Sequence, residues 1–66
     1  MKIQYDREED AVYFELARGK YDTTRKVSDA LLVDEDKNGK ILGIEILDAS
    51  KNIKKFNPQK TKFEFA

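Results

Sequence analysis

Apolar and polar residues alternate along most of the chain. A period of two places successive side chains on opposite faces of an extended strand, so the alternation indicates β-structure and not helix. It predicts strands at residues 3–5, 12–16, 27–34 and 40–47. The polar cluster at residues 6–10 separates the first two of these strands, which predicts that they form a hairpin.

The last two predicted strands are apolar on both faces. Residues 30–33 are Ala-Leu-Leu-Val, and residues 41–47 are apolar at five of seven positions. Two-sided strands of this kind lie in the middle of a sheet, or in a sheet that is covered on both sides. Between them, Asn38 and Gly39 predict a tight hairpin turn of the primed type, in which both residues take the left-handed backbone conformation.

The period changes after Asp48. Ser50 is positioned to cap a short helix in which Ile53 and Phe56 share one face. Pro58 ends this helix, because proline lacks a backbone N–H and biases the preceding residue away from helical conformation.

These elements together predict an α+β fold that is mainly β: an antiparallel four-stranded meander followed by a short C-terminal helix. Residues 1–56 are predicted to form one small domain. Residues 57–66 form a C-terminal tail, in which Phe63 and Phe65 alternate with polar residues. This tail either adds an edge strand to the sheet or is disordered.

Three segments of the chain are similar to one known family. The most specific is Gly-Ile-Glu-Ile-Leu-Asp-Ala-Ser at residues 43–50, and the others are Lys-Ile-Gln-Tyr-Asp at residues 2–6 and the hairpin segment at residues 33–39. From residue 2 to residue 51 the chain resembles the small prokaryotic family called domain of unknown function 2283. The resemblance implies a compact β-rich domain and, in some members, gene neighbourhoods suggestive of toxin–antitoxin pairs. It brings no catalytic residue to any position of this chain.

The composition excludes several kinds of chemistry. The chain has 66 residues and contains no histidine and no cysteine, so it cannot build a Ser-His-Asp site, a Cys-His site or a zinc site with sulfur ligands. We therefore expect no enzyme activity, no catalytic residue and no metal or cofactor site. No apolar run approaches the roughly 18 residues of a membrane span, and no signal sequence is recognisable, so we expect a cytoplasmic protein with no membrane partner.

Residues 34–45 satisfy the calcium-loop pattern of an EF-hand. Oxygen-bearing side chains stand at the first, third and fifth positions (Asp34, Asp36 and Asn38), with glycine at the sixth and Glu45 at the twelfth. The pattern binds calcium only when one helix enters the loop and another leaves it, whereas the flanking residues here are typical of strands. We expect a hairpin, which places Glu45 too far along a strand to reach the ion, and we leave open a weak cation site at the other three residues.

The C-terminal part of the chain is basic. Residues 51–66 carry five lysines and one glutamate, a net charge of +4, although the whole chain has a net charge of zero. Lysines beside aromatic rings can neutralise phosphates and stack on bases. The ordinary interpretation is a solvated helix face with its aromatic residues in the core, and the zero net charge of the chain favours it. The candidate interaction surface comprises Lys51, Lys54, Lys55, Phe56, Phe63 and Phe65.

The function expected from these observations is non-enzymatic binding. We expect an antitoxin-like or regulatory partner of another protein, which it covers with its sheet edge or its basic tail. The alternative is a small nucleic-acid-binding protein that uses the basic, phenylalanine-containing C-terminal segment, although the charge balance makes nucleic acid the weaker prediction.

The acidic residues receive ordinary interpretations. Asp6, Glu8, Glu9 and Asp10 form a polar turn and are expected to be hydrated carboxylates with ordinary pKa values. Glu45 interrupts an apolar strand, and we expect it to face solvent or to pair with a lysine on a neighbouring strand.

The predicted helix is too small to cover the predicted sheet. A four-stranded sheet is roughly 15 to 20 Å wide, whereas one helix covers a strip of about 10 Å. A second layer must cover the remaining apolar positions, which include Val12, Phe14, Leu16, Leu42, Ile44 and Ile46. We expect another copy of the chain to supply this layer in a symmetric homodimer, with a different protein, for example a toxin-like partner, as the alternative.

Overall fold

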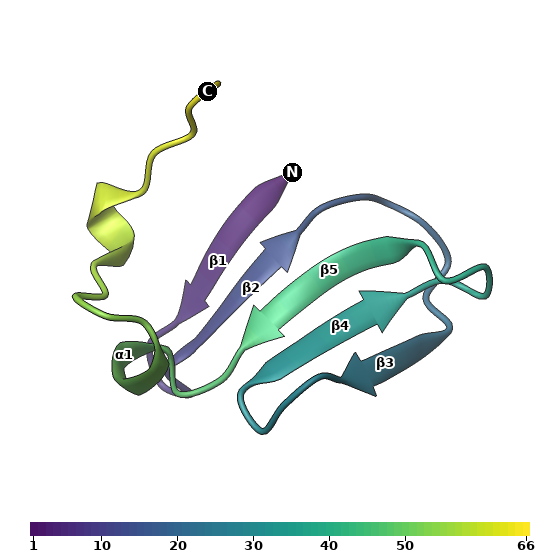
Figure 1. Ribbon diagram of the computed structural model, residues 1–66, viewed down its shortest axis with the longest axis horizontal. Helices are drawn as coiled ribbons and strands as arrows, with labels where there is room; N and C mark the ends of the chain where they lie inside the picture. The colour runs from purple at the N-terminus through teal and green to yellow at the C-terminus, as the bar shows by residue number, and fades with distance from the viewer.

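Five antiparallel strands form one twisted sheet in the computed structural model, which describes residues 1–66 (Figure 1). The elements in chain order are β1 (Lys2–Asp6), β2 (Ala11–Glu15), β3 (Thr23–Lys26), β4 (Leu31–Glu35), β5 (Ile41–Ile46), α1 (Ala49–Asn52) and a 3₁₀ turn at Pro58–Lys60. The strands lie in the order β1-β2-β5-β4-β3. The mainly β fold with a short C-terminal helix is therefore confirmed.

The predicted four-stranded meander is wrong in two respects. The structure contains an additional strand, β3, at one edge of the sheet, and β2 pairs with β5 instead of with the strand that follows it in the chain. The loop after β2 crosses to the far edge of the sheet, where β3 begins (Figure 1). The predicted strand at residues 27–34 begins at Leu31, because Val27 and Ser28 form the turn before it, with both of their backbone N–H groups donating to the Leu31 carbonyl.

The strand register sorts the side chains onto two different faces. The first face, called the apolar face below, carries two rows of paired residues across four strands: Ile3, Phe14, Ile44 and Val33 in one row, and Tyr5, Val12, Ile46 and Leu31 in the other. The second face, called the polar face, carries the alternate residues of the strands. Gln4, Tyr13, Glu45 and Leu32 form one row, and Lys2, Glu15, Gly43, Asp34 and Thr24 form another. The strand β5 lies at the centre, as expected for a two-sided strand.

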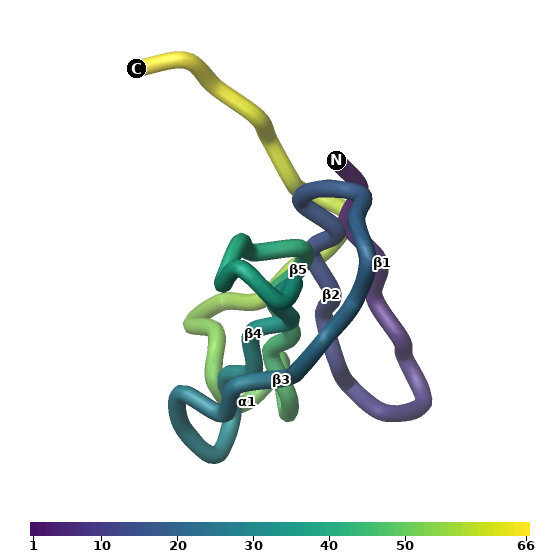
Figure 2. The backbone as a smooth tube through the Cα atoms, turned by 90° about the vertical axis from the view of Figure 1, so that its right-hand side faces the viewer, coloured from purple at the N-terminus to yellow at the C-terminus, as the bar shows by residue number.

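The C-terminal segment covers part of the apolar face. The ring of Phe56 packs edge-on against Tyr5, with ring centroids 5.0 Å apart, and Ile53 lies with it over Val12, which is buried. The tail then runs away from the sheet (Figure 2), and residues 61–66 belong to no strand. On the sheet side, only residues of β1 and β2 line the pocket beneath this segment, although Val33 in β4 is also buried.

The predicted helix is shorter than expected and begins differently. It ends at Asn52, and Ile53 is already extended, with φ −110° and ψ 116°. The residue that precedes it is Asp48, in the left-handed conformation with φ 48°, and its side chain makes no capping hydrogen bond. Ser50 lies inside the helix and does not cap it. Four residues form barely one turn, so tertiary contacts must hold this helix in place.

The hairpin between β4 and β5 is confirmed, but its turn is not of the primed type. The backbone N–H of Gly39 donates to the carbonyl of Asp36 at 3.0 Å, and the N–H of Asp36 donates to the carbonyl of Lys40 at 2.9 Å. Gly39 has φ 80°, whereas Asn38 does not have a positive φ. This is a three-residue loop in which glycine alone takes the left-handed conformation. Strands flank the loop on both sides, so the helix–loop–helix geometry of an EF-hand is absent.

Neither helical segment has the length and apolar character needed to cross a membrane.

Candidate functional site

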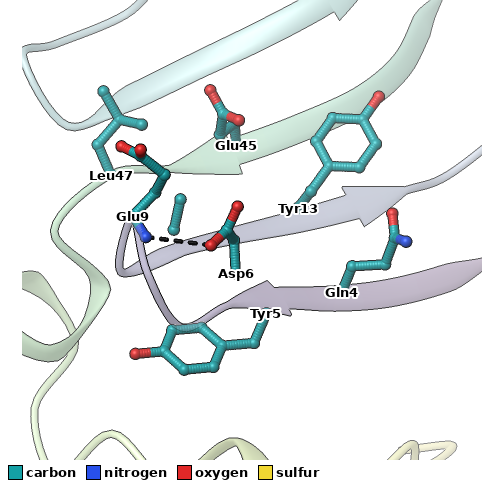
Figure 3. Close-up of a pocket in the computed structure, with 8 residues that line it drawn as sticks. Gln4, Tyr5, Asp6, Glu9, Tyr13, Glu45 and Leu47 are labelled. Atoms are coloured by element: carbon teal, nitrogen blue, oxygen red, sulfur yellow. Dashed lines mark hydrogen bonds between the residues drawn. The ribbon is translucent and has the colours of Figure 1, made fainter.

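A shallow hollow lies on the polar face of β1, β2 and β5 (Figure 3). Its volume is about 600 Å³. Gln4, Tyr13 and Glu45 share one row of the sheet, and their side chains rise from the same side of three neighbouring strands. The full lining consists of Gln4, Tyr5, Asp6, Glu9, Ala11, Tyr13, Glu45 and Leu47. The floor is thus partly apolar and the rim is acidic.

The carboxylates of this hollow have no cationic partner. The three salt bridges of the molecule join Arg25 to Glu35, Lys26 to Asp29, and Lys62 to Glu64, and none of them involves Asp6, Glu9 or Glu45. Glu45 thus has no cross-strand lysine and remains partly exposed. A side-chain oxygen of Asp6 accepts hydrogen bonds from the backbone N–H groups of Glu8 and Glu9, both at 3.0 Å, which orients it in the turn.

No group of acidic side chains is close enough together to hold a metal ion. Asp34 and Asp36, which the calcium pattern singles out, are occupied by protein hydrogen bonds. Asp34 accepts from Tyr13 and Thr24, whereas Asp36 accepts from the backbone N–H groups of Asn38 and Lys40, both at 2.9 Å. Asp36 therefore shapes the hairpin turn. The hollow offers dispersed negative charge, which suits cationic side chains of a partner better than a bound ion.

Tyr13 crosses the polar face above Gly43, which has no side chain to block it. Its hydroxyl donates to Asp34 at 3.1 Å, Thr24 donates to the other oxygen of Asp34 at 2.7 Å, and Thr24 shares a hydrogen bond with Tyr21. Burial of the hydroxyl, followed by the hydrogen bond to Asp34, raises the pKa of Tyr13 above its ordinary value. This chain of hydrogen bonds ties three strands together, and the sequence patterns did not predict it.

Asp10 joins the first turn to the helix. Its carboxylate accepts hydrogen bonds from the Ser50 hydroxyl at 2.6 Å, from the Ser50 backbone N–H and from the Tyr5 hydroxyl at 2.7 Å. The backbone carbonyl of Asp10 accepts a hydrogen bond from the backbone N–H of Ala49, and Ala49 is fully buried. The hydrogen bond from the Ser50 hydroxyl, and then that from Tyr5, lower the pKa of Asp10, while the same contact with Asp10 raises the pKa of Tyr5.

The prediction of an ordinary pKa for Asp10 was therefore wrong. The three donors stabilise its charged form. The partner Ser50 is 40 residues away in the chain, so no local pattern could reveal the contact. The cluster has a structural role: it holds α1 against the turn at residues 6–10, because a helix of four residues is not stable without tertiary contacts.

The predicted interaction surface is only partly assembled. Phe56 turns toward the sheet and packs on Tyr5, whereas Phe63 and Phe65 pack edge-on against each other 5.5 Å apart and are 74% and 93% exposed. These two phenylalanines are not part of a core, in contrast to the ordinary interpretation of the segment. The lysines of the surface are exposed and form no salt bridge: Lys51, Lys54 and Lys55.

The fold and the hollow define a small antiparallel β-sheet protein with an uncovered acidic face. The chain belongs to the family described as "Protein of unknown function (DUF2283)", with the match over residues 2–50. It is 44% identical over 69 aligned positions to an uncharacterised protein of Methanocaldococcus jannaschii. The alignment covers 98% of this chain and 57% of that protein, so the chain spans a little over half of its relative's length. No solved structure matches the chain.

Proposed function

We propose that the protein is a non-enzymatic binding module, antitoxin-like or regulatory, which covers a positively charged surface of another protein with its polar face. The observation that carries this proposal is the set of carboxylates around the hollow, Asp6, Glu9 and Glu45, which have no cation of their own. We further propose that it acts in the cytoplasm, because the absence of cysteine suits a reducing compartment.

An acidic face suits a protein that blocks a nucleic-acid-binding partner. Enzymes that bind RNA or DNA present basic surfaces to the phosphates. A partner that inhibits such an enzyme must offer negative charge of similar spacing, and complementary charge also speeds the encounter. Tyr13 and Leu47 add aromatic and apolar contact area within the acidic hollow. Aromatic side chains are enriched where partners bind tightly.

Binding without catalysis is supported by the direction of the pKa shifts. The pKa of Asp10 moves down, and the pKa values of Tyr5 and Tyr13 move up. All three shifts lead away from neutral pH, whereas an acid or base catalyst requires a pKa close to the working pH. The shifts have structural causes: the hydrogen bonds that join Asp10 to Ser50 and Tyr5, and, for Tyr13, burial followed by the hydrogen bond to Asp34.

The proposal is tested by affinity purification of the tagged protein from its native host at low salt. The test variant removes the charges of the hollow: Asp6→Asn, Glu9→Gln and Glu45→Gln. The matched control removes the same number of exposed charges elsewhere: Asp22→Asn, Asp29→Asn and Glu64→Gln. We expect a basic protein to be retained by the wild type and the control, to be released by added salt, and to be retained at least about tenfold more weakly by the test variant.

Two outcomes would contradict the proposal. The first is a partner that the test variant and the wild type retain equally, because the acidic hollow would then take no part in binding. The second is equal weakening by the test variant and the control, because only the net charge would then matter.

The exposed aromatic tail supports a second candidate function, nucleic-acid binding. Phe63 and Phe65 are largely exposed and are close in the sequence to Lys60 and Lys62, and aromatic rings with nearby lysines are the combination that binds single-stranded nucleic acid. Binding of a fluorescent single-stranded RNA, measured at several salt concentrations, tests this. Retention that Phe63→Ala and Phe65→Ala abolish would support it, and no binding at low salt would exclude it.

A further inference from the structure

The molecule exposes more surface than a folded monomer of its size. Its accessible surface is 5754 Å², whereas a compact monomer of 7.7 kDa exposes about 4,300 Å². Its radius of gyration is 12.5 Å, against about 10.8 Å for a compact chain of this length. Only six residues are buried. The excess surface is about 1,400 Å², to which the exposed tail at residues 57–66 contributes, and each subunit of a stable dimer buries roughly 800 Å².

Part of the exposed apolar surface lies in one groove. A groove of about 700 Å³ lies between the apolar face at β1 and β2 and the start of the C-terminal tail. Ile3, Phe14 and Leu16 line it from the sheet, and Phe63 lines it from the tail. Ile3 is 50% exposed although it lies within a strand. Ile44 in the central strand is paired with Phe14 and is incompletely covered.

The charges of the two faces differ in a way that selects the occupant of this groove. Near the groove, Lys62 is paired with Glu64, and the two other charged residues of the lining, Lys2 and Glu15, are opposite in sign and face each other across β1 and β2. Elsewhere on the apolar face, Glu35 is paired with Arg25. The charges around the groove therefore balance, and a second copy can approach this face. The polar face would instead place the unpaired carboxylates of one copy against those of the other, which is unfavourable.

We propose that a second copy of the chain packs on the apolar face, with the groove at Ile3, Phe14, Leu16 and Phe63 at the centre of a two-fold interface. A two-fold axis brings the same patch of both subunits together, so one self-compatible apolar patch is sufficient. The second copy supplies the layer that the single short helix cannot supply. The polar face remains free in the dimer. The interface is therefore independent of binding through the polar face, and either one can fail without the other.

Size-exclusion chromatography with light scattering, over protein concentrations of about 1 to 100 µM, tests the proposal. We expect the wild type to have twice the mass of the 7.7 kDa chain. Two variants place a charge in the interface: Ile3→Lys in β1 and Phe63→Lys in the unpaired tail. Each should weaken the dimer at least about tenfold, while circular dichroism shows the sheet to be retained.

The matched control is Tyr21→Lys. Tyr21 is 58% exposed, comparable to Ile3, but it lies beside Tyr13 and Asp34 of the polar face. This variant should remain a dimer, as should the variant that lacks the three carboxylates of the hollow. Phe63 lies in no strand, so its replacement tests the interface even if Ile3→Lys unfolds the protein. A wild type that is monomeric at every concentration would overturn the proposal, as would a dimer that survives both interface variants.

Discussion

Replacing Gly43 by alanine tests the packing that positions the polar face. A Cβ atom at this position would overlap the Tyr13 hydroxyl, would lie 2.5 Å from the ring atom Cζ and would lie 3.0 Å from the backbone carbonyl oxygen of Phe14. The ring must therefore move, and its hydrogen bond to Asp34 is lost. The magnitude follows from these two changes and from the conformational preference of alanine.

The lost hydrogen bond is only partly shielded from water, so it costs about 1 kcal/mol. Displacing the ring from its rotamer and its packing costs about 1 to 2 kcal/mol more. Alanine returns roughly 0.5 kcal/mol, because glycine loses more chain entropy on folding. Gly43→Ala should therefore lower the free energy of unfolding by about 2 kcal/mol, or the melting temperature by about 8 to 16 °C in a protein of this size.

A double-mutant cycle with Tyr13→Val isolates the cause. In this background the ring is absent, and Gly43→Ala should change the free energy of unfolding by less than about 0.5 kcal/mol. Urea denaturation followed by circular dichroism, at one fixed protein concentration, measures all four proteins. An equal cost in both backgrounds would refute the reasoning, because the strain would then come from the backbone near Phe14 and not from Tyr13.

Substitutions at four further positions test other parts of the structure. Asp10→Asn should make the free energy of unfolding less sensitive to acid. The folded-state pKa of Asp10 lies below its ordinary value of 3.8, so its contribution to stability is present above pH 3.8 and is lost as the pH falls through the folded-state pKa. In urea denaturation from pH 7 to pH 2, the stability of the variant should therefore fall less steeply at acid pH than that of the wild type. Ser50→Ala should remove part of the same pH dependence, because the Ser50 hydroxyl is the largest cause of the shift, whereas an unchanged acid limb in both variants would contradict this assignment. Phe56→Ala should cost about 2 kcal/mol in thermal melts, since the half-buried ring covers β1 and β2, and a loss below about 0.5 kcal/mol would mean that the C-terminal segment is not packed there. Gly39→Ala should cost about 1 kcal/mol because of its φ of 80°, and Gly39→Asn should cost less, so equal stability of all three proteins would argue against the left-handed turn.

Alternation and a polar turn were sufficient to predict the β1–β2 hairpin. The β4–β5 hairpin followed from two apolar segments on either side of Asn38 and Gly39. Neither signal could predict β3. The four residues of that strand, Thr23–Lys26, are all polar and exposed, and the strand exists because its backbone pairs with β4. An edge strand with no buried side chain leaves no hydrophobic pattern to detect. The pairing of β2 with β5 was equally hidden, since local periodicity does not specify which strands become neighbours.

For similar reasons, the sequence indicated only some of the residues of the candidate site. Glu45 stood out as a charge in an apolar strand, and it does lie in the acidic hollow. The space above Gly43 that Tyr13 fills was not predicted, although a glycine inside a strand is a signal for the close approach of another group. The contact of Asp10 with Ser50 joins residues far apart in the chain, and only the folded sheet brings them together.

The two faces of the sheet have different chemistry, which supports separate roles for them. On the apolar face Val12 and Val33 are buried, whereas Ile3 is half exposed. The polar face carries unpaired carboxylates around Tyr13. A dimer through the first face would present two copies of the second face to the outside. Such an arrangement would bind a two-fold symmetric partner, or two copies of a monomeric one, with an avidity that a single sheet lacks.

The most direct test of the proposed dimer through the apolar face is an isotope-filtered nuclear Overhauser experiment on an equal mixture of labelled and unlabelled chains. Intermolecular signals should connect the Ile3 methyl protons of the labelled chain to aromatic protons of the unlabelled one, and signals from Glu45 to the other chain should be absent. A folded protein with no intermolecular signal at Ile3, or with such signals from the polar face instead, would contradict the account.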